Sequence, residues 1–274
     1  MEMVKLEGDT YTTALRHLSL MERKLPSLVF YRDVISIVLR ASRKAKRNRY
    51  DTSEWCNSSI EVLTALERVG VTLEITGMDF FKKLDVPCVF IGNHMSTLET
   101  FVLPTIIAPF RETTFVVKQD LVDYPVFKYV MRSRNPITVG RANPRDDLKA
   151  VLEGGTERLR NGTSIIIFPQ TTRTATFDPD QFNTIGVKLA KKAVAPVVPI
   201  ALKTDAWGTG TYLKDYGLIH PSKIAHIAFG EPLWISDRGA DEHQKIVEFI
   251  TNKLAAWSKE TTQKMSRSTE ARSL

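Results

Sequence analysis

The residues whose types and spacing point most directly to chemistry lie in the stretch FIGNHMSTLETF, residues 90–101. His94 follows an apolar run that is predicted to be a strand, and Glu99 stands five residues later. An imidazole held by a carboxylate is a common form of general base, because the carboxylate fixes the tautomer and stabilises the imidazolium. Ser96 and Glu99 also fit the S-x-x-E pattern of a helix capping box, with Ser96 as N-cap. The two roles are compatible, so Glu99 is a candidate for both.

Two further stretches carry side chains suited to binding an anion. In SIIIFPQTTRT, residues 164–174, a predicted strand runs into a hydroxyl-rich turn that contains Gln170, Thr172 and Arg173. Backbone N–H groups, hydroxyls and a guanidinium together form an anion cradle. Arg141, in NPITVGRANPRDD, ends another predicted strand and is a second candidate for holding a phosphate. The alternative for each stretch is an ordinary strand-to-loop exit with a solvated arginine.

Apolar segments that alternate with helical patterns surround these residues. Strands are predicted at 71–77, 87–93, 113–118, 136–140, 164–169, 196–202 and 226–230. Helices are predicted at about 96–108, 146–160, 182–193 and 240–258. This alternation predicts an α/β fold with a mixed, largely parallel sheet covered by helices on both faces. Sites in such sheets gather at the carboxyl ends of the strands, which is where His94 stands.

The N-terminal region has a different pattern. LPSLVFYRDVISIVLRASRKAKRNRY, residues 25–50, begins apolar and ends basic. It predicts an amphipathic helix whose apolar face consists of Leu28, Tyr31, Val34, Ile35, Val38 and Leu39. The cations predicted to bind a membrane are Arg40, Arg43, Lys44, Lys46 and Arg47. An amphipathic helix that runs into a polybasic segment favours the interface of an anionic membrane. Two alternatives stay open: a helix packed on the domain with a solvated basic end, and a nucleic-acid patch.

Length and composition limit the possible classes of protein. The 274 residues suit one large domain with an appendage, and the predicted organisation is an N-terminal helical, membrane-interfacial segment (1–60), an α/β domain (61–258) and a flexible tail (259–274). The net charge of +7 indicates an anionic partner. Cys56 and Cys88 are expected to be reduced, and neither a signal peptide nor a spanning helix is expected. Scattered histidines predict no metal site, and the G-x-S-x-G elbow of a serine hydrolase is absent.

Taken together, these stretches resemble the phospholipid/glycerol acyltransferase family, which includes the 1-acylglycerol-3-phosphate acyltransferases. NHMSTLE resembles the first family motif, with Glu99 where Asp is most common. VVKQDL, with Lys118, resembles the segment that follows, and ITVGR places the arginine of the second motif at Arg141. FPQTTRT resembles the third motif, and FNTIGVKLAKKAVAPVVPIAL resembles the closing stretch. The resemblance covers roughly residues 75–230, and the order of the motifs makes it specific.

The resemblance implies transfer of a fatty acyl group from acyl-CoA or acyl carrier protein to the hydroxyl of a lysolipid. His94 would be the general base and Glu99 its partner, and backbone N–H groups near residues 168–172 would bind the oxyanion. Arg141 and Arg173 would hold the anionic head of the acceptor. The expected partners are the lysolipid, the acyl donor and an anionic membrane surface, with no nucleic acid. The expected location is the cytoplasmic face of a membrane, bound peripherally, with no cofactor beyond the co-substrate.

The third motif departs from the family pattern at two positions. Gln170 and Thr171 stand where the family usually has Glu and Gly. Gln keeps a hydrogen bond but cannot accept a proton, and Thr has a Cβ that would be strained at positive φ. Because the His94 and Glu99 pair is intact, a changed acceptor is favoured over a dead enzyme. The alternative function is a catalytically silent, lipid-binding relative of the family.

Overall fold

The computed structural model describes residues 8–170 and 172–270. In this part of the chain one mixed sheet of eight strands forms the centre of the molecule. Its order is β1-β2-β8-β7-β3-β6-β4-β5. The strands are β1 (Tyr11–Thr12), β2 (Thr72–Thr76), β3 (Val89–Gly92), β4 (Thr113–Lys118), β5 (Ile137–Val139), β6 (Ser164–Ile167), β7 (Val197–Lys203) and β8 (Ile224–Phe229).

The five strands from β7 to β5 run parallel to one another. Strand β8 is antiparallel to β7 and parallel to β2, and β1 is antiparallel to β2. The predicted fold class, a mixed and largely parallel sheet between helices, is therefore confirmed. The carboxyl ends of β7, β3, β6, β4 and β5 all meet at one edge of the sheet.

The central strands are continuous apolar runs because both of their faces are buried. In β3, Phe90 points into one hydrophobic core and its neighbours Val89 and Ile91 point into a second core on the opposite face. The same alternation holds in β6, where Ile166 lies in the first core and Ile165 in the second. Side chains packed on both faces fix the register, because a one-residue slip would exchange the two cores.

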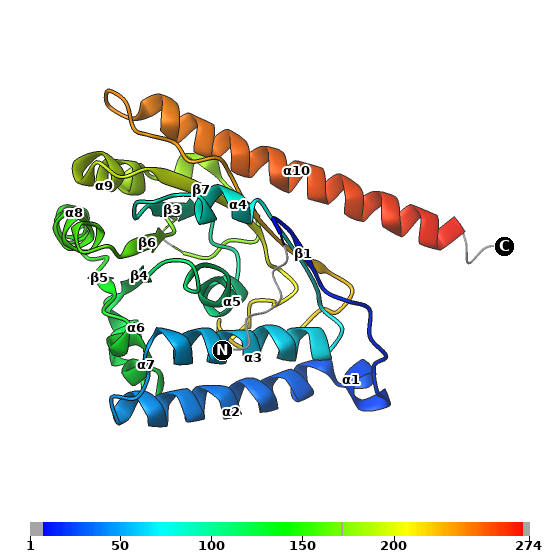
Figure 1. Ribbon diagram of the computed structural model, residues 1–274. Helices are drawn as coiled ribbons and strands as arrows, with labels where there is room; N and C mark the ends of the chain where they lie inside the picture. The colour runs from blue at the N-terminus through cyan, green and yellow to red at the C-terminus, as the bar shows by residue number, and fades with distance from the viewer. Residues whose placement is uncertain (1–7, 171, 271–274) are drawn as a thin grey trace.

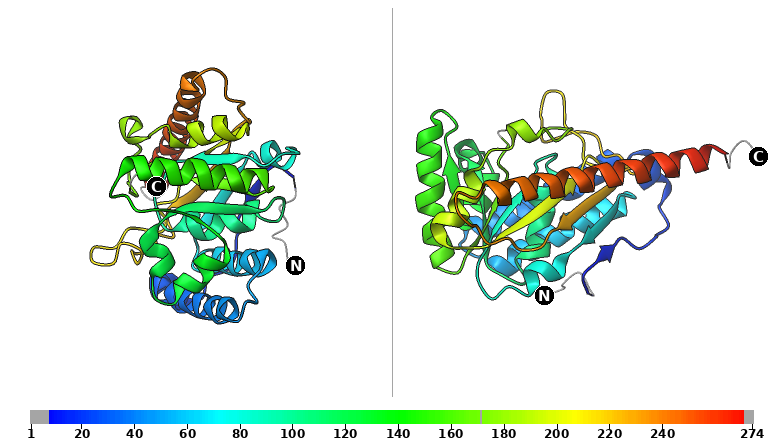
Figure 2. Two further views of the ribbon diagram at one scale, coloured as in Figure 1. Left: turned by 90° about the vertical axis from the view of Figure 1, so that its left-hand side faces the viewer. Right: turned by 90° about the horizontal axis from the view of Figure 1, so that it is seen from above.

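Helices cover both faces of the sheet, as Figure 1 and Figure 2 show. On one face lie α8 (Pro144–Arg160), α9 (Ile185–Ala193) and α10 (Ala240–Glu270). On the other face lie α5 (Leu98–Ile107) and α3 (Thr52–Arg68), with α2 (Pro26–Lys46) packed outside α3. The short helices are α1 (Leu20–Lys24), α4 (Met78–Lys82), α6 (Gln119–Asp123), α7 (Phe127–Ser133) and the 3₁₀ turn η1 (Pro179–Gln181).

Most helix predictions are correct to within a few residues, but the ends differ. Helix α10 continues to Glu270, whereas the sequence predicted its end at about 258. Helix α3 was not predicted, and it lies between α2 and α5. The division of the chain at residues 60 and 258 stays a prediction. Within the described residues, no helix is both long enough and apolar enough to cross a bilayer.

The predicted apolar face of α2 needs a correction. The side chains that α2 buries against the body include Phe30, Val34 and Ile37. Leu28 and Ile35, which the prediction placed on the same apolar face as Val34, are 64% and 50% exposed, and Leu39 is exposed as well. Helix α2 therefore has two apolar stripes, and periodicity alone cannot tell which of them meets the domain. The exposed stripe of Leu28, Ile35 and Leu39 remains on the outer surface.

Candidate active site

The site is assembled from three neighbouring parallel strands. Strand β3 lies between β7 and β6, and all three end at the same edge of the sheet. His94 follows β3, Gln170 follows β6 and Thr204 follows β7 directly. Residues that are about 100 positions apart in the chain are therefore brought into contact. Figure 1 shows α5 leaving β3 at this edge.

Glu99, in the first turn of α5, orients His94. Its Oε1 atom lies 2.9 Å from Nδ1 of His94 and accepts the backbone N–H groups of Met95 at 2.7 Å and Ser96 at 2.8 Å. Its Oε2 atom accepts hydroxyl hydrogen bonds from Thr204 at 2.6 Å and from Ser96 at 3.0 Å. The carboxylate is completely buried, so each of these bonds acts in a low-dielectric environment. The position of the imidazole is therefore fixed by a carboxylate that is itself held on both oxygens.

The predicted capping box forms only in part. The helix begins at Leu98 with Thr97 as N-cap, and the Ser96 hydroxyl accepts the N–H of Leu98 rather than that of Glu99. The Glu99 carboxylate does accept the Ser96 N–H, as the box requires. Ser96 is thus not the N-cap that the sequence predicted, because its hydroxyl turns inward toward Thr204 and Glu99.

The ring of His94 is partly exposed to solvent. Its side chain is 17% exposed, and it stacks on Phe168 with ring centroids 4.5 Å apart and planes at 5°. Because Nδ1 faces Glu99, Nε2 is the nitrogen that is available for proton transfer. Within the described residues Nε2 has no hydrogen-bond partner. A base with one nitrogen anchored and the other accessible is the geometry that general base catalysis needs.

The pKa of Glu99 lies below its ordinary value. Burial alone would raise this pKa, but the hydrogen bond and charge of His94, together with bonds from Thr204 and Ser96, outweigh the burial. Glu99 is therefore ionised at neutral pH. An ionised carboxylate stabilises the imidazolium that forms when His94 takes a proton.

The loop after β6 is tied to His94 through its backbone. The N–H of His94 donates to Oε1 of Gln170 at 2.7 Å, and Nε2 of Gln170 donates to the Thr174 hydroxyl at 2.8 Å. The N–H of Thr174 donates to the carbonyl of His94 at 3.1 Å. Gln170 thus supplies the acceptor that a Glu would supply, and its amide adds a donor. Thr171 lies outside the described residues.

Arg173 approaches the start of α5. Its Nη1 atom donates to the Thr97 hydroxyl, and its Nη2 atom lies 2.6 Å from the carboxylate of Asp215. Thr97 stands three residues after His94, so the guanidinium lies on the same side of the sheet edge as the imidazole. Thr172 is exposed beside it. The structure thus brings His94, Glu99, Gln170 and Arg173 together.

Comparison with known proteins shows a family similarity over part of the chain. Residues 72–203, which contain His94, Glu99, Gln170 and Arg173, match the family model described as Acyltransferase. Over these residues, just under half of the chain, the protein is similar to the Acyltransferase family. The chain is 28% identical over 209 residues to a 1-acyl-sn-glycerol-3-phosphate acyltransferase of Pseudomonas aeruginosa, which covers 71% of this chain and 79% of that protein. It is 28% identical to a probable 1-acyl-sn-glycerol-3-phosphate acyltransferase of Mycoplasma pneumoniae, over 73% of this chain and 76% of that protein.

A further relative has the same name, and a solved structure shares the fold. An acyltransferase of the same name from Cocos nucifera is 25% identical over 66% of this chain, which spans 56% of that protein's length. The crystal structure of the 1-acyl-sn-glycerophosphate acyltransferase PlsC from Thermotoga maritima has a TM-score of 0.63, with 18% identity, and covers 87% of this chain and 97% of that one. At that identity the match shows a shared fold. The enzyme class indicated by the relatives is O-acyltransferase.

Two predicted residues lie farther along the same edge of the sheet. Lys118 ends β4 and Arg141 follows β5, so their strands are two and three positions from β3. Lys118 is exposed and lies 3.7 Å from Asp120. Arg141 is exposed at a φ of 60°, and its backbone N–H donates to Asp147. Neither makes a contact with the His94 cluster in the part of the chain that the structure describes.

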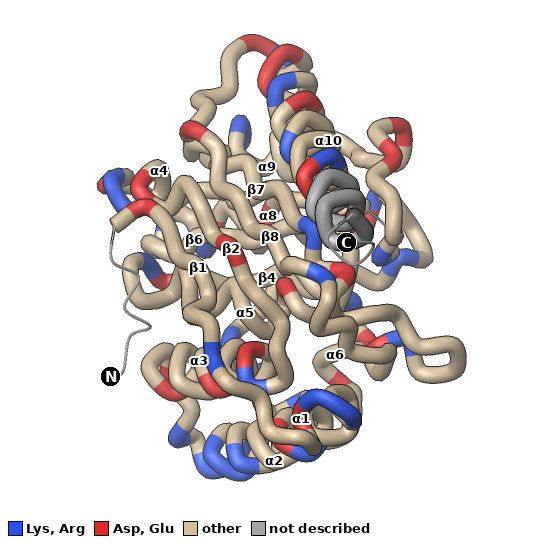
Figure 3. The backbone as a smooth tube through the Cα atoms, turned by 90° about the vertical axis from the view of Figure 1, so that its right-hand side faces the viewer, with Lys and Arg blue, Asp and Glu red and all other residues tan. Residues whose placement is uncertain are grey.

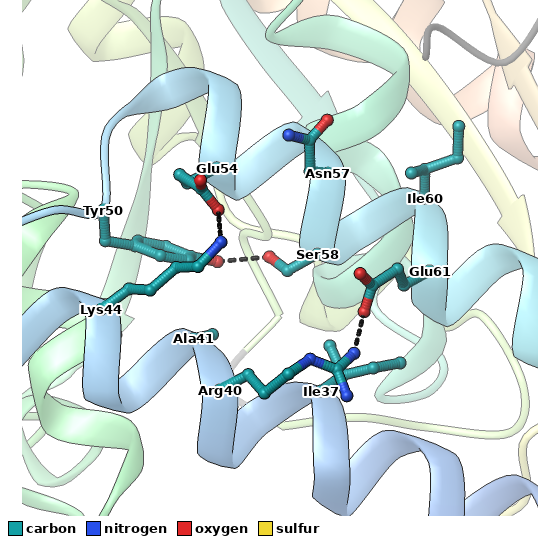
Figure 4. A pocket seen from close by; sticks show the side chains of 10 residues that line it. All are labelled: Ile37, Arg40, Ala41, Lys44, Tyr50, Glu54, Asn57, Ser58, Ile60 and Glu61. Carbon is teal, nitrogen blue, oxygen red and sulfur yellow. Dashed lines mark hydrogen bonds and ion pairs between the residues drawn. The ribbon is translucent and has the colours of Figure 1, made fainter. Parts of the chain in front are cut away.

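The predicted membrane-binding cations differ in their surroundings. A cavity of about 300 Å³ lies between α2 and α3. Figure 4 shows the two ion pairs across it, Arg40 with Glu61 and Lys44 with Glu54. Lys46 stands 5.8 Å from the ring of Tyr129. Arg43 and Arg47 are exposed, and no carboxylate among the described residues pairs with them. Figure 3 shows basic residues gathered along α2 at the edge of the molecule.

Sequence reasoning missed three residues of this site. Thr204 has no local signal, because only the pairing of β7 with β3 brings it to Glu99. Asn93 stands inside the first motif, but its role was not recognised: its side chain bridges β3 to β7 through both backbone groups of Leu202. Asp215 lies in a loop without any motif. Of these, only Asn93 could have been found, as a buried amide directly after a strand.

Proposed function

We propose that this chain transfers a fatty acyl group from the thioester of acyl-CoA or acyl carrier protein to the hydroxyl of a lysophospholipid. The observation that carries the proposal is the buried Glu99 carboxylate held 2.9 Å from Nδ1 of a partly exposed His94. The names of the relatives from Pseudomonas aeruginosa and Mycoplasma pneumoniae support a glycerolipid acceptor that carries a phosphate.

The proposed reaction begins with proton transfer to His94. Nε2 of His94 takes the proton of the acceptor hydroxyl as the oxygen attacks the thioester carbonyl. The tetrahedral oxyanion collapses, the carbon–sulfur bond breaks, and the thiolate receives the proton back from the imidazolium. Glu99 stabilises the imidazolium between these two transfers. General base catalysis of this kind is worth about 10²- to 10⁴-fold. Neither a metal nor a further cofactor takes part in these steps.

The anionic head of the acceptor is assigned to Arg173, with Gln170 and Thr172 shaping the loop around it. Arg173 supports this role because it lies beside Thr97 at the start of α5, close to the proposed base. A planar guanidinium matches a phosphate well. Lys118 and Arg141 lie farther along the same sheet edge, where they would attract anionic substrates rather than touch the reacting atoms.

Peripheral attachment to the cytoplasmic face of an anionic membrane would bring the lysolipid to this site. The exposed stripe of Leu28, Ile35 and Leu39 on α2 supports it. Arg43 and Arg47 lie beyond the stripe at helical spacing and are the best-placed cations. Arg40 and Lys44 contribute less in this proposal, because α3 carboxylates already neutralise them. Apolar side chains with flanking cations are the features of an interfacial helix.

The test is an acyl-transfer assay with both donors and a panel of lysolipids, read by mass spectrometry. We expect a diacyl product with a phosphate-bearing acceptor. The second candidate is a silent lipid-binding protein, which the Gln170 replacement favours. Binding of lysolipid without product from any donor and acceptor would contradict the enzyme and support the silent relative.

A further inference from the structure

The loop of residues 208–218 places a carboxylate on the arginine that the proposed function assigns to the acceptor. It projects from the body in the left view of Figure 2, where it is coloured yellow. Asp215, in this loop, lies 2.6 Å from Nη2 of Arg173, whose side chain is only 20% exposed. The Thr97 hydroxyl lies 3.4 Å from the same carboxylate oxygen and also receives a bond from Nη1 of Arg173. In this structure the carboxylate of Asp215 therefore occupies the guanidinium of Arg173.

The loop is held in shape mainly by backbone hydrogen bonds. Its two sides are joined by the N–H of Gly208 donating to the carbonyl of Leu218 at 2.9 Å, and by the N–H of Tyr216 donating to the carbonyl of Leu213 at 2.9 Å. The indole N–H of Trp207 donates to the carbonyl of Asp215 at 3.2 Å. The side chains at the tip are largely exposed, and Tyr212 is 97% exposed. Few buried apolar contacts oppose the opening of such a loop.

The base of the loop is fixed to α2. The hydroxyl of Tyr31 donates to the carbonyl of Gly217, and the ring of Tyr31 lies 5.6 Å from that of Tyr216. The N–H of Ile219 donates to the hydroxyl of Ser27 at 3.0 Å. Because these anchors hold residues 216–219, displacement of the Asp215 carboxylate requires movement only of its side chain and of the exposed tip that precedes it.

We propose that Asp215 is a specificity-determining residue that occupies Arg173 until the anionic head of an acceptor displaces it. This inference rests on the proposed function, which assigns Arg173 to that head. A phosphate competes for the guanidinium with more charge and more acceptor oxygens than a carboxylate. An acceptor without charge cannot compete in this way. Asp215 therefore sets the Michaelis constant for anionic acceptors and leaves that for neutral acceptors unchanged.

The first experiment compares Asp215→Asn with the wild type on two soluble acceptors, a short-chain lysophosphatidate and the matching monoacylglycerol. We expect the KM for lysophosphatidate to fall about threefold or more, the size expected for a half-exposed ion pair, with kcat unchanged. The KM for monoacylglycerol should stay the same. Asp205→Asn is the matched control, because it removes one charge from the same region by breaking a pair with Lys223. An unchanged or raised KM for lysophosphatidate, or an equal shift with both acceptors, would overturn the proposal.

A second experiment separates this proposal from the proposed function, because it needs no turnover. Calorimetry measures binding of the short-chain lysophosphatidate to the wild type and to Asp215→Asn, and hydrogen exchange follows the amides of 208–218 in the wild type. We expect tighter binding by the variant and faster exchange in the wild type when the ligand is present. Both results would uphold the displacement even if no acyl transfer were found. Equal binding, or exchange that the ligand leaves unchanged or slows, would refute it.

Discussion

At the scale of single residues, the account depends on how Glu99 is held. Each of its two oxygens accepts hydrogen bonds from His94, Thr204 or the turn at the start of α5, and no part of the carboxylate reaches solvent. The spacing of His94 and Glu99 predicted the pair from the sequence. The sequence could not predict that Thr204 completes it, because that contact exists only after β7 has paired with β3.

The Glu99→Gln variant separates the orienting role from the structural one. The amide keeps one acceptor oxygen, puts a donor where the other carboxylate oxygen accepted bonds, and has no charge, so it no longer stabilises the His94 imidazolium. We expect kcat to fall about 100-fold or more and the melting temperature to fall as well, because bonds to a buried charge are worth about 1.5–3 kcal/mol. Thr204→Val is the control, since it removes one of these bonds and keeps the charge. A loss of stability with a normal kcat would make Glu99 a structural cap alone.

Gln170→Glu tests whether the departure from the family motif matters for turnover. A carboxylate at this position can still accept the N–H of His94, and the Thr174 hydroxyl can rotate to donate to it. We therefore expect the rate of acyl transfer to stay within about threefold of the wild type, measured at saturating acceptor. If the wild type is inactive and the variant is active, this expectation is contradicted and Gln170 is the cause of the inactivity.

At the scale of elements, α2 shows what periodicity in the sequence can and cannot predict. Its helix was predictable from periodicity, but its buried face was not, because the helix carries apolar side chains on two stripes. Burial of Phe30 and Val34 follows from the way α2 packs on α3 and the sheet core, which is a property of the whole fold. The stripe that remains exposed is the one that the membrane proposal uses.

The double variant Leu28→Ser with Ile35→Ser tests whether the exposed stripe of α2 binds the membrane. Burying one such side chain in a bilayer is worth about 1.5–3 kcal/mol, so the pair should weaken binding to anionic vesicles at least tenfold. Co-sedimentation with vesicles containing phosphatidylglycerol measures the effect. Trp234→Ser is the control, because Trp234 is 58% exposed but lies outside α2. If both variants bind as the wild type does, α2 is not the attachment surface.

At the scale of the whole molecule, one arginine joins three helices. Arg68 of α3 donates to Glu22 of α1 at 2.9 Å and to Asp33 of α2 at 3.0 Å. The bond from Arg68, followed by those from Ser19, lowers the pKa of Glu22 to about 2. Because this pKa is lower in the folded state, the ionised group stabilises the fold above about pH 4.5, and that contribution disappears as the pH falls toward 2.

The predicted signature is a pH-dependent difference between the wild type and Glu22→Gln. The urea midpoint of the wild type should exceed that of the variant at pH 7, and the difference should shrink as the pH falls from 4.5 toward 2. Glu153→Gln, at an exposed position on α8, should show no such dependence. A difference that stays constant down to the lowest pH would contradict the assigned cause.

The sheet shows which parts of the structure could be predicted from the sequence and which could not. Apolar runs predicted the parallel strands and the sheet edge beyond which His94 and Arg173 lie, because both follow from local patterns. The order of strands does not follow from local patterns, and that order separates Arg141 on the outermost strand from the His94 cluster. It also places Asp215 on Arg173, a contact between segments 42 residues apart for which the sequence has no signal.

The most direct test of the central claim is the kcat of His94→Ala in acyl transfer to a short-chain lysophosphatidate, measured beside its melting temperature. The account predicts that kcat falls about 10²- to 10⁴-fold, while the protein stays folded and still binds the acceptor. A folded His94→Ala variant that transfers acyl groups at the wild-type rate would contradict the account.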